Sequence, residues 1–230
     1  MFDQQVYRDA VELRNRERVE PLIETNAFRA GIYCVLSARE TYGKLLKICR
    51  QLFVNNDLGL ADAILEDVLL DNSVLEQILN QTMGRRLQQV IDFSSWWNQT
   101  GFYDRIKGGI DFSAEVELRN YLVGNSTKGG APGLGPKSTS LYLNMLGCEQ
   151  VVPVDIWVLR YLGVEVPNRG ISLPDYHNYE MVLKEEAKKI GVSPAMMHKL
   201  IWCSTSDWKR RRTSQLDLFQ TESHNFYKKI

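Results

Sequence analysis

Residues 132–137 read Pro132-Gly133-Leu134-Gly135-Pro136-Lys137, and this stretch decides which fold the sequence predicts. The glycines permit a tight turn with positive φ and let a ligand approach the backbone closely. Pro136 suits the first turn of a helix, where its missing N–H costs little. The stretch therefore predicts a turn that leads into a helix N-terminus, where exposed N–H groups favour a phosphate.

Several kinds of site place a glycine-rich turn before a lysine. A nucleotide P-loop needs Gly directly before Lys and a strand ahead of the loop, whereas Pro136 precedes Lys137 here. A dinucleotide-binding turn needs a third glycine and a leading strand. A helix-hairpin-helix presents such a turn to one DNA backbone and fits helical flanks. A plain glycine-rich connection with a solvated lysine is equally compatible with the loop taken alone.

Outward from this turn, apolar residues recur at helical spacing along almost the whole chain. Strand-type alternation is nearly absent, so the sequence predicts an all-α protein. Asn26 is expected to cap one helix and Ser113 another. Helices are expected at residues 26–52, 59–70, 73–81, 85–99, 113–123, 136–147, 155–163, 174–190 and 193–205.

The amino-acid composition limits the class of protein but does not identify a binding partner. The chain has 230 residues and a formal net charge of +0, from 28 basic and 28 acidic side chains. A neutral total is mild evidence against nucleic-acid binding, but such binding needs only a local cationic surface. With no apolar run of bilayer length and no secretory pattern at the N-terminus, a soluble cytoplasmic protein is expected.

Cysteine and histidine spacing argues against a metal site. The four cysteines stand at positions 34, 49, 148 and 203, without a C-x-x-C pair. That spacing predicts neither a disulfide framework nor a zinc or iron–sulfur ligand set. The three histidines are scattered as well. Buried free thiols are therefore expected, with no metal and no cofactor.

Asp155 begins another expected helix, directly after Val151-Val152-Pro153-Val154. Taken alone it predicts an N-cap, which stabilises a helix by about 1 kcal/mol. It follows Lys137 by eighteen residues, with one expected helix between them. This joint placement decides how the glycine-rich turn is interpreted.

Two segments together carry a resemblance to a known family: Pro132-Gly133-Leu134-Gly135-Pro136-Lys137 and Pro153-Val154-Asp155-Ile156-Trp157-Val158-Leu159-Arg160. They resemble the signature of the helix-hairpin-helix (HhH-GPD) DNA glycosylase superfamily, which includes endonuclease III and the 8-oxoguanine DNA glycosylases. Its pattern is G-x-G-x-K, a helix, and then V-D at the distance seen here.

Within that superfamily, the chain is most similar to the compact 8-oxoguanine glycosylases that lack an iron–sulfur cluster. Endonuclease III-like members usually carry a set of cluster cysteines after the aspartate, but only Cys203 follows Asp155 here. Residues 200–206 are similar to the C-terminal helix of the compact group, and residues 29–38 to its early helix. The likeness covers roughly residues 26–208. The loop at 124–135 is longer than in that group, and the chain continues past the helix at which its members end.

The resemblance implies a two-lobed helical fold with the active-site cleft between the lobes. Residues 1–25 and 124–208 would form an N/C-terminal lobe, and residues 26–123 a central lobe that includes the first hairpin helix. Residues 124–147 would hold the hairpin loop and its second helix. Residues 209–230 would form a flexible tail.

The resemblance also implies a bifunctional DNA glycosylase and abasic-site lyase that excises 8-oxoguanine. Lys137 would attack C1′ of the sugar and form a Schiff base, and Asp155 would assist. Two alternatives remain: the same chemistry on an oxidised pyrimidine or a phage-type modified base, and a helix-hairpin-helix module that only binds DNA. The partner would be double-stranded DNA with a damaged base, bound by a monomer. The expected DNA contacts are Gly133, Leu134, Gly135, Ser138 and Lys128, and the expected base-pocket residues are Trp202 and Cys34.

Near the C-terminus, Gln215-Leu216-Asp217-Leu218-Phe219 resembles the pentapeptide by which bacterial DNA-processing proteins dock on the replicative sliding clamp. An unstructured segment of this kind can bury Leu218 and Phe219 in a hydrophobic groove while Gln215 fixes the register. A chance amphipathic patch that packs back on the domain is the alternative. Clamp binding would place the protein at the nucleoid of a bacterium.

Overall fold

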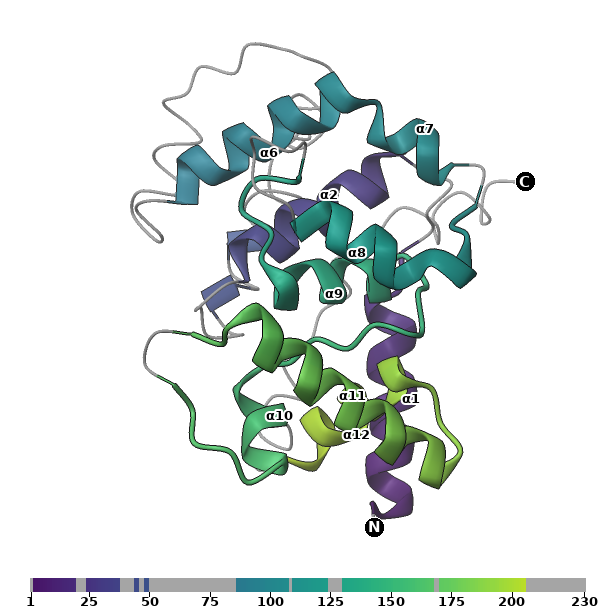
Figure 1. The fold of residues 1–230 in the computed structure, drawn as a ribbon. Helices are drawn as coiled ribbons and strands as arrows, with labels where there is room; N and C mark the ends of the chain where they lie inside the picture. The colour runs from purple at the N-terminus through teal and green to yellow at the C-terminus, as the bar shows by residue number, and fades with distance from the viewer. Residues whose placement is uncertain are drawn as a thin grey trace, which may run out of the picture.

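A computed structural model of the chain describes residues 2–19, 24–37, 44–45, 48–49, 86–107, 109–123, 130–167 and 170–205. Regular structure in these ranges is helical, without a strand, so the predicted all-α class is confirmed (Figure 1). The helices expected at 59–70 and 73–81 lie outside the described residues. The elements are α1 (Gln4–Glu17), α2 (Glu24–Leu36), α6 (Arg86–Thr100), α7 (Phe102–Ile106), η1 (Phe112–Ala114), α8 (Glu115–Val123), α9 (Pro136–Met145), α10 (Ile156–Tyr161), α11 (Leu173–Ile190) and α12 (Pro194–Ser204).

Two of the expected helix caps are wrong. Asn26 lies inside α2, because that helix begins at Glu24. Ser113 lies inside the short helix η1, whose cap is Asp111: the carboxylate accepts the Ser113 N–H at 2.9 Å. A carboxylate two residues upstream competes for the same N–H groups, so a nearby serine alone does not fix the start of a helix.

One half of the molecule gathers α2, α6, α7, α8 and α9 around an aromatic core (Figure 1). Phe28, Phe93, Trp97 and Phe102 are at most 2% exposed, and the rings of Phe28 and Trp97 lie 5.5 Å apart. Gly31 allows α2 to approach α6, since a Cβ there would lie 2.3 Å from Cζ of Phe93. Close aromatic packing thus fixes the helices beneath the glycine-rich turn.

The other half consists of α1, α10, α11 and α12 (Figure 1). The first and last described helices, α1 and α12, pack along each other through Leu13, Leu200 and Cys203. A separate cluster joins α10, α11 and α12, with Val158 and Leu183 fully buried. The lobe boundaries drawn from the sequence remain a prediction; α9 contributes its apolar side chains to the α2–α6 core.

No described helix is both long and apolar enough to cross a membrane.

Candidate active site

Lys137 is the second residue of α9, and its charge acts on both Cys34 of α2 and Asp155 at the start of α10. Gly133 takes φ 77°, which favours glycine, and a Cβ there would lie 3.0 Å from Cγ1 of Val35 on α2. The turn therefore lies directly against α2. Lys137 is partly buried, and Gly135 before it is exposed.

The N-terminus of α9 differs from those of the helices that follow it. Gly135 is its N-cap and provides no side-chain cap, whereas Asp155, Ser172 and Ser193 cap α10, α11 and α12 with side-chain oxygens. The first-turn N–H groups of a helix have no intrahelical acceptor. Those of α9 can therefore bind a phosphate, with the helix dipole adding attraction.

The expected DNA contacts divide into backbone and side-chain positions. The side chains of Leu134 and Ser138 are buried, so these residues can reach DNA only through their backbones. Gly133 and Gly135 also offer only backbone groups. Lys128 lies outside the described residues.

Asp155 caps α10 with one carboxylate oxygen and leaves the other to a histidine. Its Oδ1 accepts the N–H groups of Trp157 at 2.9 Å and Val158 at 3.0 Å. Its Oδ2 lies 3.5 Å from Nε2 of His198, and the Asp155 side chain is 14% exposed. Sequence reasoning found Asp155 but missed His198, because a single histidine within a helix carries no signal.

The charges around Asp155 keep it ionised near neutral pH. Burial acts to raise the pKa of this carboxyl, but His198, the positive charge of Lys137 and the Val158 N–H together hold the pKa below its ordinary value. The charge of Lys137 thus acts directly on Asp155. An ionised carboxylate can stabilise positive charge that develops nearby, and an amine can act as a nucleophile.

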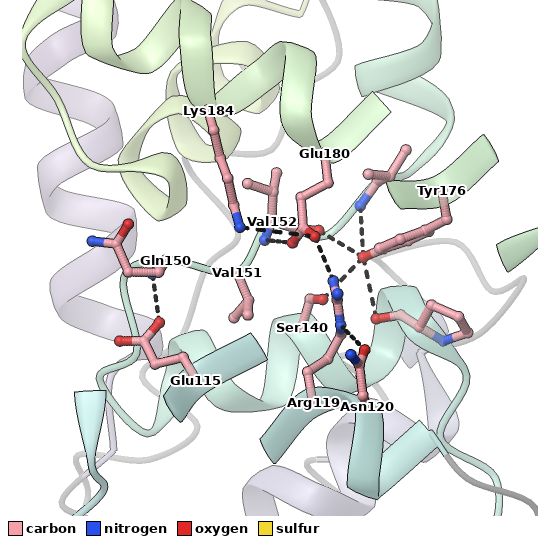
Figure 2. Close-up of polar contacts among 12 residues, drawn as sticks. Glu115, Arg119, Asn120, Ser140, Gln150, Val151, Val152, Tyr176, Glu180 and Lys184 are labelled. Carbon is pink, nitrogen blue, oxygen red and sulfur yellow. Dashed lines mark hydrogen bonds and ion pairs between the residues drawn. The ribbon is translucent and has the colours of Figure 1, made fainter. Parts of the chain in front are cut away.

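The buried hydroxyl of Tyr176 connects Ser140 of α9 with Val152 in the loop after that helix (Figure 2). Tyr176 of α11 donates its O–H to the Val152 carbonyl at 2.6 Å and accepts the Val154 N–H at 3.3 Å. Ser140 of α9 lies 2.9 Å from the same oxygen, and the carbonyl of Pro136 lies 3.2 Å from it. Tyr176 therefore ties the helix of Lys137 to the segment that carries Asp155.

A buried ion pair also holds this segment at Val152. Arg119 of α8 donates to Oε2 of Glu180 at 2.7 Å, and the two side chains are 1% and 4% exposed. The other oxygen, Oε1, accepts the Val152 N–H at 2.9 Å. Glu115 accepts backbone N–H groups of Glu149 and Gln150 in the loop after α9 (Figure 2). Side chains of α8 and α11 therefore hold the loop between the lysine and the aspartate.

Sequence reasoning missed this network as well. Charged residues in amphipathic helices are usually solvated, and partners 61 positions apart leave no local signal.

Cys34 and Trp202 were predicted to line the base pocket. Cys34 is fully buried, with its sulfur 3.7 Å from Sδ of Met145, and burial raises the pKa of its thiol well above the ordinary value. Trp202 is partly buried and follows His198 by four residues, so both lie on one face of α12. The pocket itself remains a prediction for both residues.

Among the described residues, no group of three or more His, Cys, Asp or Glu side chains lies together so as to hold a metal ion.

The fold is similar to those of solved 8-oxoguanine DNA glycosylases. The 8-oxoguanine DNA glycosylase of Methanocaldococcus jannaschii is 19% identical, with a TM-score of 0.62 over 86% of this chain and 85% of that one. The same archaeal glycosylase/lyase in complex with a 15mer DNA containing 8-oxoguanine also gives a TM-score of 0.62 and 19% identity, over 86% and 87% of the two chains. The 8-oxoguanine DNA glycosylase of Thermotoga maritima is 20% identical, with a TM-score of 0.58 over 88% of each chain.

No protein-family model matches the chain, and no curated protein sequence matches it. The structural likeness covers nearly the full length of both partners in each comparison. The chain therefore has the all-α fold of 8-oxoguanine DNA glycosylases.

Proposed function

We propose that this protein is a bifunctional DNA glycosylase and abasic-site lyase that acts on duplex DNA containing a damaged base. The observation that carries the proposal is the placement of Lys137 at an uncapped helix N-terminus, within the electrostatic reach of an ionised Asp155. The shared fold supports it, because the solved proteins of that fold are 8-oxoguanine glycosylases, one of them described as a glycosylase/lyase.

In the proposed reaction, the N–H groups at the start of α9 bind a phosphate and place the sugar beside Lys137. The neutral Nζ bonds to C1′ as the bond from C1′ to the base breaks; the electron pair leaves with the base, which takes up a proton. Asp155 stabilises the positive charge on the sugar and accepts the proton that the amine loses. Ring opening gives a Schiff base, and loss of a proton at C2′ expels the 3′ phosphate and nicks the strand.

We propose 8-oxoguanine as the base, since the archaeal protein of the same fold is described in complex with DNA that contains it. Another modified base is the alternative for the same lysine and aspartate. A module that only binds DNA would require neither residue.

Borohydride trapping tests the proposal on duplexes that contain 8-oxoguanine, thymine glycol or an abasic site. A covalent adduct on the 8-oxoguanine duplex that is lost in Lys137→Ala establishes both the mechanism and the base. Trapping on the thymine glycol duplex, or on the abasic duplex alone, refutes the base assignment but not the lyase chemistry. If a folded, DNA-binding protein forms no adduct on any duplex, the Lys137 mechanism is wrong.

Asp155→Asn provides a matched variant, because asparagine keeps an oxygen that can cap α10 but removes the charge. Its rate of base excision should fall by about 100-fold or more while the thermal midpoint changes little.

We further propose that Gln215-Leu216-Asp217-Leu218-Phe219, which lies outside the described residues, docks on a bacterial sliding clamp. The support is the match of all five positions to that motif, with two adjacent apolar side chains for a hydrophobic groove. A monomer acting in the bacterial cytoplasm would then be recruited to replicating DNA. Loss of clamp binding in Leu218→Ala/Phe219→Ala, with trapping unchanged, is the expected result; unchanged binding refutes the docking.

A further inference from the structure

His198 is buried without satisfied hydrogen bonds. Its side chain is 6% exposed, and among the residues that the structure describes neither ring nitrogen has a hydrogen-bond partner. Buried polar atoms almost always have partners, so a buried imidazole with two unsatisfied nitrogens requires an explanation. Its Nε2 lies 3.5 Å from Oδ2 of Asp155, slightly beyond hydrogen-bond length. Hydrogen bonds at catalytic groups are often long until substrate is bound.

The charged groups that act on His198 come from two helices and from the N-cap of α10. They are Asp155 before α10, Lys199 beside it on α12, and Glu17 of α1. Lys199 is engaged in a buried ion pair with Glu17, so these two charges largely compensate each other. The charge near His198 that is not compensated is therefore that of Asp155, on which Lys137 of α9 also acts.

The two oxygens of Asp155 have different surroundings. Oδ1 is occupied by the N–H groups of Trp157 and Val158, which cap α10. Oδ2 faces His198. A neutral imidazole with its proton on Nε2 would donate to Oδ2 and fix the carboxylate plane without cancelling its charge.

We infer that His198 is a positioning residue, which orients Oδ2 of Asp155 for the chemistry of Lys137 while remaining uncharged. The inference rests on the proposed function and adds a residue to it. Burial supports the neutral form, because it lowers the pKa of His198 below the ordinary 6.5, against the opposing effect of Asp155.

A neutral His198 predicts a particular pH dependence. Protonated His198 would cancel the charge of Asp155 and slow the reaction at low pH. Because burial lowers the pKa of His198, the wild type and a variant that cannot titrate at residue 198 should depend on pH in the same way near neutral pH. They should diverge only at acidic pH, where the wild-type rate falls more steeply.

The experiment compares single-turnover cleavage of an abasic duplex by wild type, His198→Gln and His198→Leu from about pH 5 to about pH 8. Glutamine keeps an N–H donor near the Nε2 position but does not titrate. Leucine keeps an apolar side chain of similar bulk and removes the donor. His177→Gln is the matched control, since His177 is a partly buried histidine of α11 whose Nε2 also has no hydrogen-bond partner in the described part of the chain.

We expect His198→Gln to retain the wild-type rate within about threefold at high pH and to fall less steeply than the wild type at the acidic end of the range. His198→Leu should lose about tenfold or more at every pH, while His177→Gln keeps the wild-type pH dependence. Circular dichroism verifies that each variant is folded. A wild-type rate in folded His198→Leu near neutral pH, or a His198→Gln rate as low as that of His198→Leu, overturns the inference.

An NMR titration separates this inference from the proposed function. Nitrogen shifts of the imidazole report the pKa of His198 without any turnover. Because Asp155 raises that pKa, Asp155→Asn should lower it further. If wild type cleaves no abasic duplex, the proposed function fails, and the titration alone decides: an unchanged pKa in Asp155→Asn then overturns the inference too.

Discussion

Replacing Glu180 with glutamine would remove one charge from the buried pair that holds the segment before Asp155 (Figure 2). The amide oxygen of glutamine can still accept the Val152 N–H, which Glu180 now accepts at 2.9 Å. Arg119, however, would keep its charge at 1% exposure without a counter-ion. Leaving a buried charge without its partner costs about 3–5 kcal/mol. For a chain of this size, that lowers the thermal midpoint by roughly 6–20 °C.

The double variant Arg119→Met/Glu180→Gln tests the cause of that loss. It removes the uncompensated charge, so it should be more stable than the sum of the two single variants predicts, by about 1–3 kcal/mol. Urea unfolding of the four proteins completes the cycle. Additive losses, or a Glu180→Gln variant within about 0.5 kcal/mol of wild type, would refute the assignment of Arg119–Glu180 as a coupled buried pair.

Three further perturbations follow from the described contacts. Tyr176→Phe leaves the Val152 carbonyl without its 2.6 Å donor and should cost about 1–3 kcal/mol in urea unfolding; an unchanged midpoint would contradict this role. Gly31→Ala places a Cβ 2.3 Å from Phe93 and should cost about 1–3 kcal/mol by thermal unfolding, whereas a neutral result would show that the ring moves freely. Below about pH 6.5, the free energy of unfolding of His198→Gln should depend less on pH than that of the wild type. In the wild type the histidine takes up a proton when unfolded but resists protonation when buried, so the protein loses up to about 1.4 kcal/mol per pH unit from this group. Identical slopes in urea unfolding at several pH values would contradict that assignment.

Local signals in the sequence located the helices that carry the candidate site. Pro136 begins α9 as expected, and Asp155 caps α10 as its simplest interpretation predicted. These features depend on residues within one turn of each other, so they can be predicted without tertiary contacts. Asn26 and Ser113 show the limit of such signals, since many polar residues can cap a helix and the packing of the chain selects one.

The support of the site could not be predicted in this way. Arg119 belongs to α8, whereas Tyr176 and Glu180 belong to α11, far away in sequence. Each is an ordinary polar residue on an amphipathic helix. Their burial results from the packing of α8 against α9 and from the hydrogen bonds of α11, which the sequence alone does not reveal. His198 is hidden for the same reason, because its relation to Asp155 exists only once α10 packs against α12.

Asp155 caps α10, and the same contacts position the carboxylate that we propose acts with Lys137. Two backbone N–H groups of α10 bind Oδ1, so the side chain is fixed by the same bonds that begin the helix. A cap of this kind stabilises the helix by about 1 kcal/mol, and that stabilisation also opposes rotation of the carboxylate away from the site. The segment before it is fixed at Val152 and Val154 by Glu180 and Tyr176. Since Tyr176 also contacts α9, displacement of the aspartate relative to the lysine helix would break buried hydrogen bonds. The contacts that stabilise the fold therefore also fix the position of Asp155 relative to the helix of Lys137.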